Sequence, residues 1–293
     1  MAFETRNIKE KEPQIKYNEP MPELPEVETV VRCLRRRLVG LEVRAIRLDF
    51  PPLVRNGRKF PARRFVGRRV VGLRRRGKMI LVDFSGGLTM IFHLKMTGQL
   101  LFGPASGPVD KHTHLRLSLR PGDSELRFRD VRKFGFMRGV STNRAGRAPE
   151  LRGLGPEPLT LDLQAFRERL KGRRGRLKGL LLNQAIIAGI GNIYADEILF
   201  ASGIDPRAEA SSLGPRRLER LWSSVREVLE EAISFKGTTV RDFRDGDGFE
   251  GLFQNRLRVY GRDGEPCPRC KAPIRRLRIS GRSAHFCPRC QRR

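Results

Sequence analysis

Four cysteines in two closely spaced pairs constrain the fold of this chain more than any other feature. They form Cys267-Pro-Arg-Cys270 and Cys287-Pro-Arg-Cys290, within the last 27 residues of the sequence. This spacing is typical of a tetrahedral zinc site, in which four thiolates leave no open position for a reacting water. Two disulfides are the alternative, which we disfavour because the N-terminus lacks the pattern of an export signal. We therefore predict one structural Zn²⁺, held by short strands and turns in the tail.

The charge of the chain indicates a polyanionic partner. Lys and Arg number 60 against 32 Asp and Glu, which gives a formal net charge of +28 over 293 residues. Guanidinium and ammonium groups in such excess can displace counterions from phosphates. A solvated basic surface and adhesion to a membrane are the alternatives. No apolar run reaches the roughly 18 residues that a membrane-spanning helix needs.

The first half of the chain predicts one helix followed by β-structure. Apolar residues recur at helical spacing over residues 25–39, where a proline opens the pattern, a glycine follows it, and Cys33 falls among the core positions. Residues 79–84 and 88–94 are apolar runs joined by Ser-Gly-Gly, which predicts a hairpin. Apolar and polar residues alternate over much of 115–129, which is typical of half-buried strands. We expect a helix packed with a two-layer β-structure.

Helical periodicity dominates the second half of the chain. Proline and glycine-proline interruptions mark residues 141–160 as a linker. Gly and Asp are frequent in residues 236–253, which we expect to form a mobile loop. Residues 1–20 carry equal numbers of acidic and basic residues without any period, which predicts a disordered arm. The four predicted helices are residues 161–171, 177–188, 193–201 and 213–234.

Short motifs spread over residues 21–293 carry the most specific information. They are MPELPEVET (21–29), RGKMILVDF (76–84), HLKMTG (93–98), RDVRKFG (129–135), LGPEPL (154–159), GIGNIYADEILF (189–200) and VYGR (259–262), followed by the cysteines. Each is weak alone, but together and in this order they resemble the bacterial formamidopyrimidine-DNA glycosylases.

The resemblance implies an α+β fold in three parts. These are an N-terminal helix plus two-layer β-sandwich, a helix–two-turn–helix domain, and a C-terminal β-hairpin zinc finger. We expect the catalytic sandwich at 22–140, the linker at 141–160, the helix–two-turn–helix domain at 161–245, and a lesion-capping loop with the zinc finger at 246–293.

The resemblance also implies a base-excision-repair enzyme. Such an enzyme is a DNA glycosylase and AP lyase that removes oxidised purines, chiefly 8-oxoguanine and formamidopyrimidines, and cleaves the strand by β,δ-elimination. Its partner is damaged double-stranded DNA, and its one cofactor is the structural zinc. We expect a monomer without a membrane partner, in the bacterial cytoplasm and associated with the nucleoid.

The resemblance assigns the chemistry to four residues. Pro22 matches the nucleophile: an amine that attacks C1′ of the deoxyribose yields an iminium, and a proline at a chain start has the required N–H and lone pair. An α-amino group titrates at about 7.7–8.0, below lysine at about 10.4, so more of it is free base.

Glu23 matches the proton donor for the opening sugar ring. Lys78 matches a lysine that holds phosphate and assists β-elimination, and Arg282 matches an arginine associated with δ-elimination. A solvated charge is the alternative for Glu23 and Lys78.

A base inside a duplex must be extruded before it can react, and the resemblance implies which residues fill the gap. Met96, Arg132 and Phe134 match the filling residues, and apolar wedges of this kind unstack DNA at about a few kcal/mol per step. Arg132 can hydrogen-bond the orphaned partner base through its planar guanidinium. Core packing is the alternative for Met96 and Phe134.

Four further residues match DNA-contacting positions of the family. Asn192 opens a helical run, where backbone N–H groups suit a phosphate and simple N-capping is the alternative. Arg173 and Lys178 lie in a basic segment whose other arginines fit a solvated charge run. His112 precedes a second histidine by two residues, and we disfavour a metal site there because no carboxylate stands at a matching spacing.

The mechanism conflicts with the start of the printed sequence. Pro22 follows 21 residues, so its nitrogen would be a tertiary amide with a delocalised lone pair and no N–H. Either translation starts at Met21 and the methionine is removed, or residues 1–20 are retained and the protein binds lesions without cutting them. We favour the first reading, because residues 1–20 carry little information and the next residues fit the family.

Two other functions stay open. An enzyme of the endonuclease VIII type would prefer oxidised pyrimidines, and the PELPEVET start together with Met96, Arg132 and Phe134 favours oxidised purines instead. A non-catalytic zinc protein that binds DNA or RNA would form no covalent complex with damaged DNA after borohydride reduction.

Overall fold

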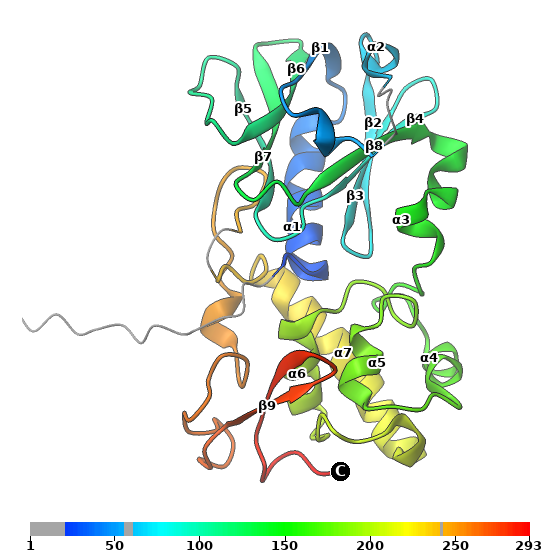
Figure 1. The fold of residues 1–293 in the computed structure, drawn as a ribbon, viewed down its shortest axis with the longest axis vertical. Coiled ribbons are helices and arrows are strands. Elements are labelled where there is room, and N and C mark those ends of the chain that lie inside the picture. The colour runs from blue at the N-terminus through cyan, green and yellow to red at the C-terminus, as the bar shows by residue number, and fades with distance from the viewer. Residues whose placement is uncertain (1–20, 56–60, 241–242) are drawn as a thin grey trace, which may run out of the picture.

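The computed structural model describes residues 21–55, 61–240 and 243–293, so the prediction for residues 1–20 lies outside the described residues. Figure 1 shows a β-rich domain above a helical domain, with helix α1 (Leu24–Leu38) running through the upper domain toward the lower one. Within the described ranges, every helix is too short or too polar to span a bilayer.

Helix α1 forms because its apolar residues fall on one face. Val27, Val31, Leu34 and Leu38 follow helical spacing and are fully buried, whereas the arginines of the last turn are exposed. Burial of each such side chain contributes about 1.5–3 kcal/mol. The predicted helix over residues 25–39 is confirmed to within one residue at each end, and Cys33 is buried as predicted.

Two antiparallel four-stranded sheets form the layers of the β-rich domain. The rings of Phe92 and Phe128, one from each sheet, stack with centroids 6.0 Å apart in the core between them. The predicted hairpin is confirmed, because residues 79–84 pair in register with residues 88–93. In order, one sheet holds β1 (Glu42–Leu48), β6 (Thr113–Arg120), β7 (Ser124–Asp130) and β5 (Gly98–Pro104), and the other holds β2 (Val70–Arg76), β3 (Met79–Phe84), β4 (Leu88–His93) and β8 (Phe136–Ser141).

Short helices connect these strands to one another and to the helical domain. An ion pair of 2.8 Å between Arg138 and Glu150 holds one of them, α3, against strand β8. The predicted linker over residues 141–160 thus contains two ordered helical turns. The short helices are η1 (Pro51–Leu53), α2 (Ala62–Phe65), η2 (Thr142–Arg147) and α3 (Pro149–Arg152).

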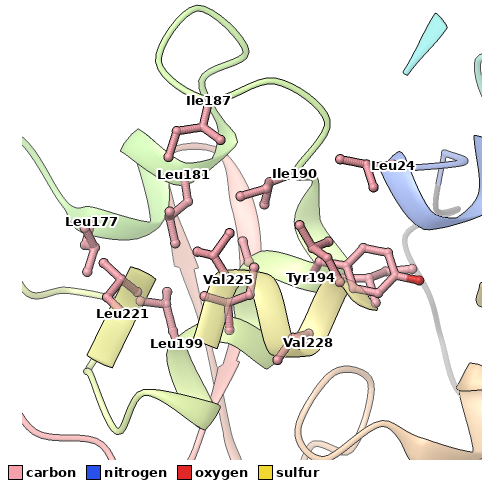
Figure 2. Close-up of a cluster of buried hydrophobic side chains, with 14 of the residues drawn as sticks. Leu24, Leu177, Leu181, Ile187, Ile190, Tyr194, Leu199, Leu221, Val225 and Val228 are labelled. Atoms are coloured by element: carbon pink, nitrogen blue, oxygen red, sulfur yellow. The ribbon is translucent and has the colours of Figure 1, made fainter. Parts of the chain in front are cut away.

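The helical domain packs around a central buried helix, α6. Every residue of α6 from Ile193 to Phe200 is buried, and Figure 2 shows Tyr194 and Leu199 from it against Val225 and Val228 of α7. Leu24, the first residue of α1, belongs to the same cluster, so this core joins the two domains. The helices are α4 (Leu163–Leu170), α5 (Leu177–Leu182), α6 (Asn192–Ala201), η3 (Ala210–Ser212), α7 (Pro215–Ser234) and η4 (Phe253–Arg256).

The prediction of a helix over residues 177–188 is wrong in its second half, because α5 ends at Leu182. The amide group of Gln184 donates to the carbonyl oxygens of Leu182 and Ile190, and its oxygen accepts from the nitrogen of Gly189. These bonds close residues 183–190 into a compact turn and satisfy backbone groups that a longer helix would have paired.

The last part of the chain is a two-stranded hairpin, β9 (Arg275–Ile279) and β10 (Arg282–Phe286), flanked by the two cysteine motifs. Short strands and turns were predicted here, and the structure confirms them. The predicted α+β fold class, with a β-sandwich, a helical domain and a C-terminal hairpin, is also confirmed.

Candidate active site

A cavity of about 1110 Å³ lies between the two domains and the hairpin. Its walls carry cationic side chains, a single carboxylate, and apolar residues from both domains. The residues that line it are Met21, Glu23, Arg55, Lys78, Lys95, Met96, Lys133, Phe134, Leu182, Gln184, Ile190, Gly191, Asn192, Tyr260 and Arg282. Such a concave, positively charged cleft can bind a segment of a polyanion. Glu23 then provides one acidic group on the wall of the cleft.

The carboxylate of Glu23 caps helix α6 from the other domain. One of its oxygens accepts from Gly191 N at 2.8 Å and Tyr194 N at 3.4 Å, and the other from Ile193 N at 3.0 Å. Gly191 is the N-cap residue of α6 and has no side chain to serve the free N–H groups. Glu23 therefore takes the place that a capping side chain usually has, and it lies at the positive end of the helix dipole.

Burial makes Glu23 a carboxyl that titrates near neutrality. Glu23 is 3% exposed, and this burial is the main cause that raises the pKa of its carboxyl to about 7. The positive charge of Lys78 and the N–H groups of Ile193 and Tyr194 oppose the rise, while the neighbouring Glu26 adds to it. A side chain with this pKa holds a proton in about half of the molecules at pH 7, which suits a general acid.

Glu26 fixes the backbone that carries Pro22 and Glu23. Its side chain accepts from Glu23 N at 2.8 Å, from the hydroxyl of Tyr194 at 2.5 Å and from Thr238 N at 2.6 Å. Burial raises the pKa of Glu26 above its usual value, while these hydrogen bonds lower it. The start of α1 is thereby tied to α6 and to the segment after α7, so Pro22, itself buried, has a defined place beside the cleft.

Lys78 lies on a turn that the linker holds in place. Glu157 accepts from Gly77 N at 2.6 Å and pairs with Arg75 at 2.5 Å and Arg76 at 2.9 Å. Burial is the first cause that lowers the pKa of Lys78, and Glu23 and Glu26 raise it in part. Lys78 is 8% exposed, so the cleft presents a sparsely hydrated amine close to the carboxyl of Glu23.

The prediction that Lys178 contacts DNA does not fit its place in the structure. Its residue is fully buried, and the ammonium group pairs with Asp196 at 2.6 Å and donates to the carbonyl of Ser283. Asp196 also accepts from the backbone N–H of His285 at 2.9 Å. Lys178 therefore joins the helical domain to the hairpin that carries Arg282, an exposed residue lining the cleft.

Two adjacent loops carry the predicted gap-filling residues. The buried carboxylate of Asp130 accepts from the hydroxyl of Thr97 at 2.5 Å and from Gly135 N at 2.7 Å, which joins the loop after β4 to the loop after β7. Met96 and Phe134 line the cleft, and Phe134 is 49% exposed. This exposure argues against core packing for Phe134 and leaves its ring available to a ligand.

Of the remaining residues predicted to contact DNA, one lines the cleft and the others lie outside it. Asn192 lines the cleft, and its Oδ1 has no hydrogen-bond partner within the described part of the chain. The alternative of N-capping by Asn192 is wrong, because the N-cap residue is Gly191. Arg132 is exposed with its guanidinium 4.8 Å from the ring of Phe134. His112 and Arg173 do not line the cleft.

Sequence reasoning missed three cationic residues of the cleft, Arg55, Lys95 and Lys133. Lys95 lies within a quoted motif and has a left-handed φ of 55°. His93 is kept neutral, since burial lowers its pKa to about 3, and its Nδ1 accepts from Lys95 N at 2.9 Å. The guanidinium of Arg55 lies 3.8 Å from the ring centre of Phe136, a contact that no spacing in the sequence reveals.

The loop predicted over residues 236–253 packs against the β-rich domain in its described part. Phe243 is buried in that domain's core, and Gly246 accepts from Phe102 N at 2.9 Å. Asp247 pairs with Arg37 at 3.2 Å. The described residues of this loop do not line the cleft, and the predicted role in capping a base stays a prediction.

The four tail cysteines fit one zinc ion. Their sulfur atoms all lie within 4.8 Å of one another, with 3.9 Å between Cys267 and Cys290 and 3.4 Å between Cys270 and Cys287. A tetrahedron with Zn–S bonds of about 2.3 Å needs sulfur atoms roughly 3.8 Å apart. The donor set of four thiolates therefore suits a structural zinc, as predicted.

Loss of this zinc is expected to disorder the hairpin without removing a reacting group. In the variant Cys270→Ser, zinc content should fall from one ion per chain to near zero, and affinity for DNA should fall because Arg282 loses its support. The matched control is Cys33→Ala, which should keep its zinc because Cys33 lies in α1. Zinc analysis and DNA titration check this, and a Cys270→Ser protein with full zinc and affinity would contradict it.

A methyl group at Gly191 is expected to disable the site. A Cβ there would lie 2.3 Å from the carboxyl carbon of Glu23, so the carboxyl must move off the end of α6. A displacement of about 1 Å can reduce a rate roughly 10²-fold, and we expect that loss of base excision in Gly191→Ala. The matched control is Gly214→Ala at the N-cap of α7, where a Cβ has no neighbour within 4 Å. Equal single-turnover rates in the two variants would contradict the assignment.

Comparisons with known protein families match the β-rich domain, the helical domain and the C-terminal hairpin. Residues 21–137 match the family model described as Formamidopyrimidine-DNA glycosylase N-terminal domain, and residues 154–244 match the H2TH domain of the same enzymes. Residues 264–293 match a zinc finger found in FPG and IleRS. Together with the cleft, these matches define a DNA glycosylase of the helix–two-turn–helix class.

Relatives and solved structures identify the family within this class. Proteins named formamidopyrimidine-DNA glycosylase from Moorella thermoacetica and Desulforamulus reducens are 46% and 44% identical over 260 residues, 87% of this chain and 94% of each relative. Lactococcus lactis Fpg in complex with an abasic site containing DNA is 37% identical with a TM-score of 0.86, over 92% of this chain and 100% of that one. MutM in complex with carbocyclic 8-oxo-G containing DNA gives 37% and 0.85, over 93% and 100%. The chain belongs to the formamidopyrimidine-DNA glycosylase family, as predicted, and family members are DNA glycosylases with AP-lyase activity.

Proposed function

We propose that the protein excises oxidised purines from double-stranded DNA and then cleaves the strand, with Pro22 as nucleophile and Glu23 as proton donor. The observation that carries this proposal is the carboxyl of Glu23, whose pKa is raised to about 7 at the base of a cationic cleft. Solved relatives are complexes with DNA that contains carbocyclic 8-oxo-G, Fapy-dG or an abasic site, which supports the same substrates here.

The proposed reaction begins with attack on the sugar. The lone pair of the Pro22 nitrogen forms a bond to C1′, the bond from C1′ to the damaged base breaks with its electrons leaving on the base, and the N–H proton of Pro22 neutralises the departing base. Glu23 gives its proton to the ring oxygen of the sugar as the ring opens, which leaves an iminium between Pro22 and C1′. Loss of a C2′ proton then expels the 3′ phosphate, and a second elimination expels the 5′ phosphate. Lys78 and Arg282 line the same cleft and hold the phosphates that leave.

This chemistry needs a free nitrogen on Pro22. We propose that the active form begins at Pro22, after translation from Met21 and removal of that methionine. The family match begins at residue 21, and the curated relatives cover 87% of this chain but 94% of their own length, which supports the proposal.

The flipped nucleotide leaves a gap that Met96, Arg132 and Phe134 are proposed to fill from their two adjacent loops. Asn192, at the start of α6, and the more distant Arg173 and His112 are proposed to contact phosphates. In this scheme residues 22–140 form the catalytic domain, and residues 161–245 and 246–293 hold the duplex. We further propose a monomer in the bacterial cytoplasm, associated with the nucleoid through its basic surface.

A comparison of two lesions tests the substrate class. The rate of excision should be at least about tenfold higher for 8-oxoguanine opposite cytosine than for thymine glycol, measured as single-turnover strand cleavage on otherwise identical duplexes. A faster reaction with thymine glycol would favour the endonuclease VIII type. Absence of cleavage and of borohydride adducts with both, using protein that begins at Pro22, would favour a non-catalytic binding protein.

A further inference from the structure

A second cavity lies at the far end of the helical domain from the β-rich domain, where Figure 1 shows the C-terminal end of the chain. It has a volume of about 540 Å³. The end of α6, the first turns of α7 and both cysteine motifs form its walls. We call it the arginine pocket, after the five arginines that line it: Arg217, Arg220, Arg269, Arg292 and Arg293.

The arginine pocket is separate from the active-site cleft. Helix α6 connects the two, since Asn192 at its first turn lines the cleft and Ala201 at its end lines the pocket. Ten residues of helix span about 15 Å. The two cavities share no lining residue, so a ligand in the arginine pocket leaves the reacting groups uncovered.

The walls of the pocket are held by hydrogen bonds. The carbonyl of Arg292 accepts from Asp205 N at 2.9 Å and from the guanidinium of Arg217 at 2.8 Å. Arg269 donates to the carbonyl oxygens of Phe200 and Ala201 at the end of α6, at 3.0 and 3.2 Å. These contacts hold Arg217 and Arg269 in place before any ligand arrives, which reduces the entropy lost on binding.

The positive charge of the pocket is only partly balanced: the charge of Arg293 acts on the carboxylate of Asp205, which is itself paired with Arg207. In residues 21–55, 61–240 and 243–293, none of the five guanidinium groups forms an ion pair with a carboxylate. Cys290 also lines the pocket, and a zinc ion with four thiolates carries a formal charge of about −2. The five arginines exceed that charge by about three, so the need to neutralise the zinc site does not account for all of them.

We propose that the arginine pocket binds an acidic segment of a partner protein, as an extended run of Asp and Glu side chains. The planar guanidinium matches a carboxylate with two parallel hydrogen bonds, and arginines from α7, from the first cysteine motif and from the last residues can each bind a carboxylate of one peptide. Ala201 and Gly203 in the wall leave room for its backbone. A DNA duplex fits less well, because its phosphates lie on a wide convex surface that reaches only the rim of a concave pocket.

The test uses the full zinc-loaded protein and a fluorescent peptide of about ten alternating Asp and Glu residues. Fluorescence anisotropy at physiological salt, where non-specific attraction is largely screened, should show saturable binding. The variant Arg220→Glu should weaken it by about tenfold or more. Arg220 is exposed, and within the described residues its side chain forms no hydrogen bond or ion pair on which folding could depend, so this variant should fold and cleave damaged DNA normally.

The matched control is Arg216→Glu, which makes the same charge change on the same helix at an exposed residue outside the pocket. It should change peptide affinity by less than about twofold, and a damaged duplex in the cleft should not displace the peptide. Equal losses in the two variants, absence of saturable binding, or displacement by the duplex would overturn the proposal. Tighter binding of single-stranded DNA of equal charge, lost in Arg220→Glu, would also overturn it and make the pocket a nucleic-acid site.

Discussion

Replacing Glu23 with glutamine is expected to slow excision of 8-oxoguanine by about 10²–10⁴-fold, the usual contribution of a positioned proton donor. Glutamine has nearly the same shape as glutamate but no acidic proton to give to the sugar. Affinity for the damaged duplex should change little, because the cationic walls of the cleft are untouched. Single-turnover excision and DNA titration with Glu23→Gln check the two halves of this prediction.

An abasic duplex separates the role of Glu23 from damage to the site. Its sugar already exposes an aldehyde, so an amine can form the iminium without help to expel a base. Glu23→Gln should therefore lose much less activity on abasic DNA than on 8-oxoguanine. The control is Glu168→Gln on α4, an exposed glutamate that should behave as the unchanged protein. Equal losses of Glu23→Gln on both substrates would contradict the role of proton donor.

The pH dependence of base excision should reflect the titration of Glu23. Burial raises the pKa of Glu23 to about 7, so the protonated form that the reaction needs is lost as the pH rises through 7. Because the free-base fraction of Pro22 still rises up to the α-amino value of about 7.7–8.0, we expect kcat/KM for base excision to fall about tenfold per pH unit only above pH 8, and the cleavage of abasic DNA to lack this decline. A flat profile of kcat/KM between about pH 8 and 9.5 would contradict the role of Glu23 as the acid.

We expect only protein with a free Pro22 nitrogen to form the covalent intermediate with damaged DNA. Protein that begins at Pro22 should form a borohydride-stable adduct with 8-oxoguanine DNA, because a secondary amine can form an iminium. In the chain that begins at Met1, this nitrogen is an amide whose lone pair is delocalised, so no such adduct should form. Gel mobility after reduction measures the difference.

The matched control is protein that begins at Met21 and keeps its methionine. It has the same cationic cleft and differs by one residue, but the Pro22 nitrogen is again an amide. It should bind the damaged duplex and form no adduct through Pro22. An equal adduct yield from both forms would show that another amine reacts.

Local patterns predicted the elements whose stability is local. Val27, Val31 and Leu34 follow helical spacing, and α1 forms where they predict it. The Ser-Gly-Gly turn and its flanking apolar runs predicted the β3–β4 hairpin in its observed register. The predicted helix over residues 177–188 is wrong beyond Leu182, because bonds from the side chain of Gln184 outweigh helical periodicity.

The site depends on contacts between distant segments, which spacing alone does not reveal. Glu23 reaches the nitrogen of Gly191, 168 residues along the chain, so its part in capping α6 was invisible in the sequence. Lys178 lies in a basic segment and was expected at the DNA surface. Its partners, Asp196 and the carbonyl of Ser283, lie 18 and 105 residues away, and only the fold brings them together.

Mass spectrometry of the reduced adduct tests the central proposal most directly. Protein that begins at Pro22 is trapped on 8-oxoguanine DNA with borohydride and digested, and the peptide that carries the sugar remnant is sequenced. We expect the remnant on the nitrogen of Pro22 and on no other residue. A remnant on Lys78 or another lysine, or strand cleavage at the full rate by a chain whose Pro22 nitrogen is an amide, would contradict it.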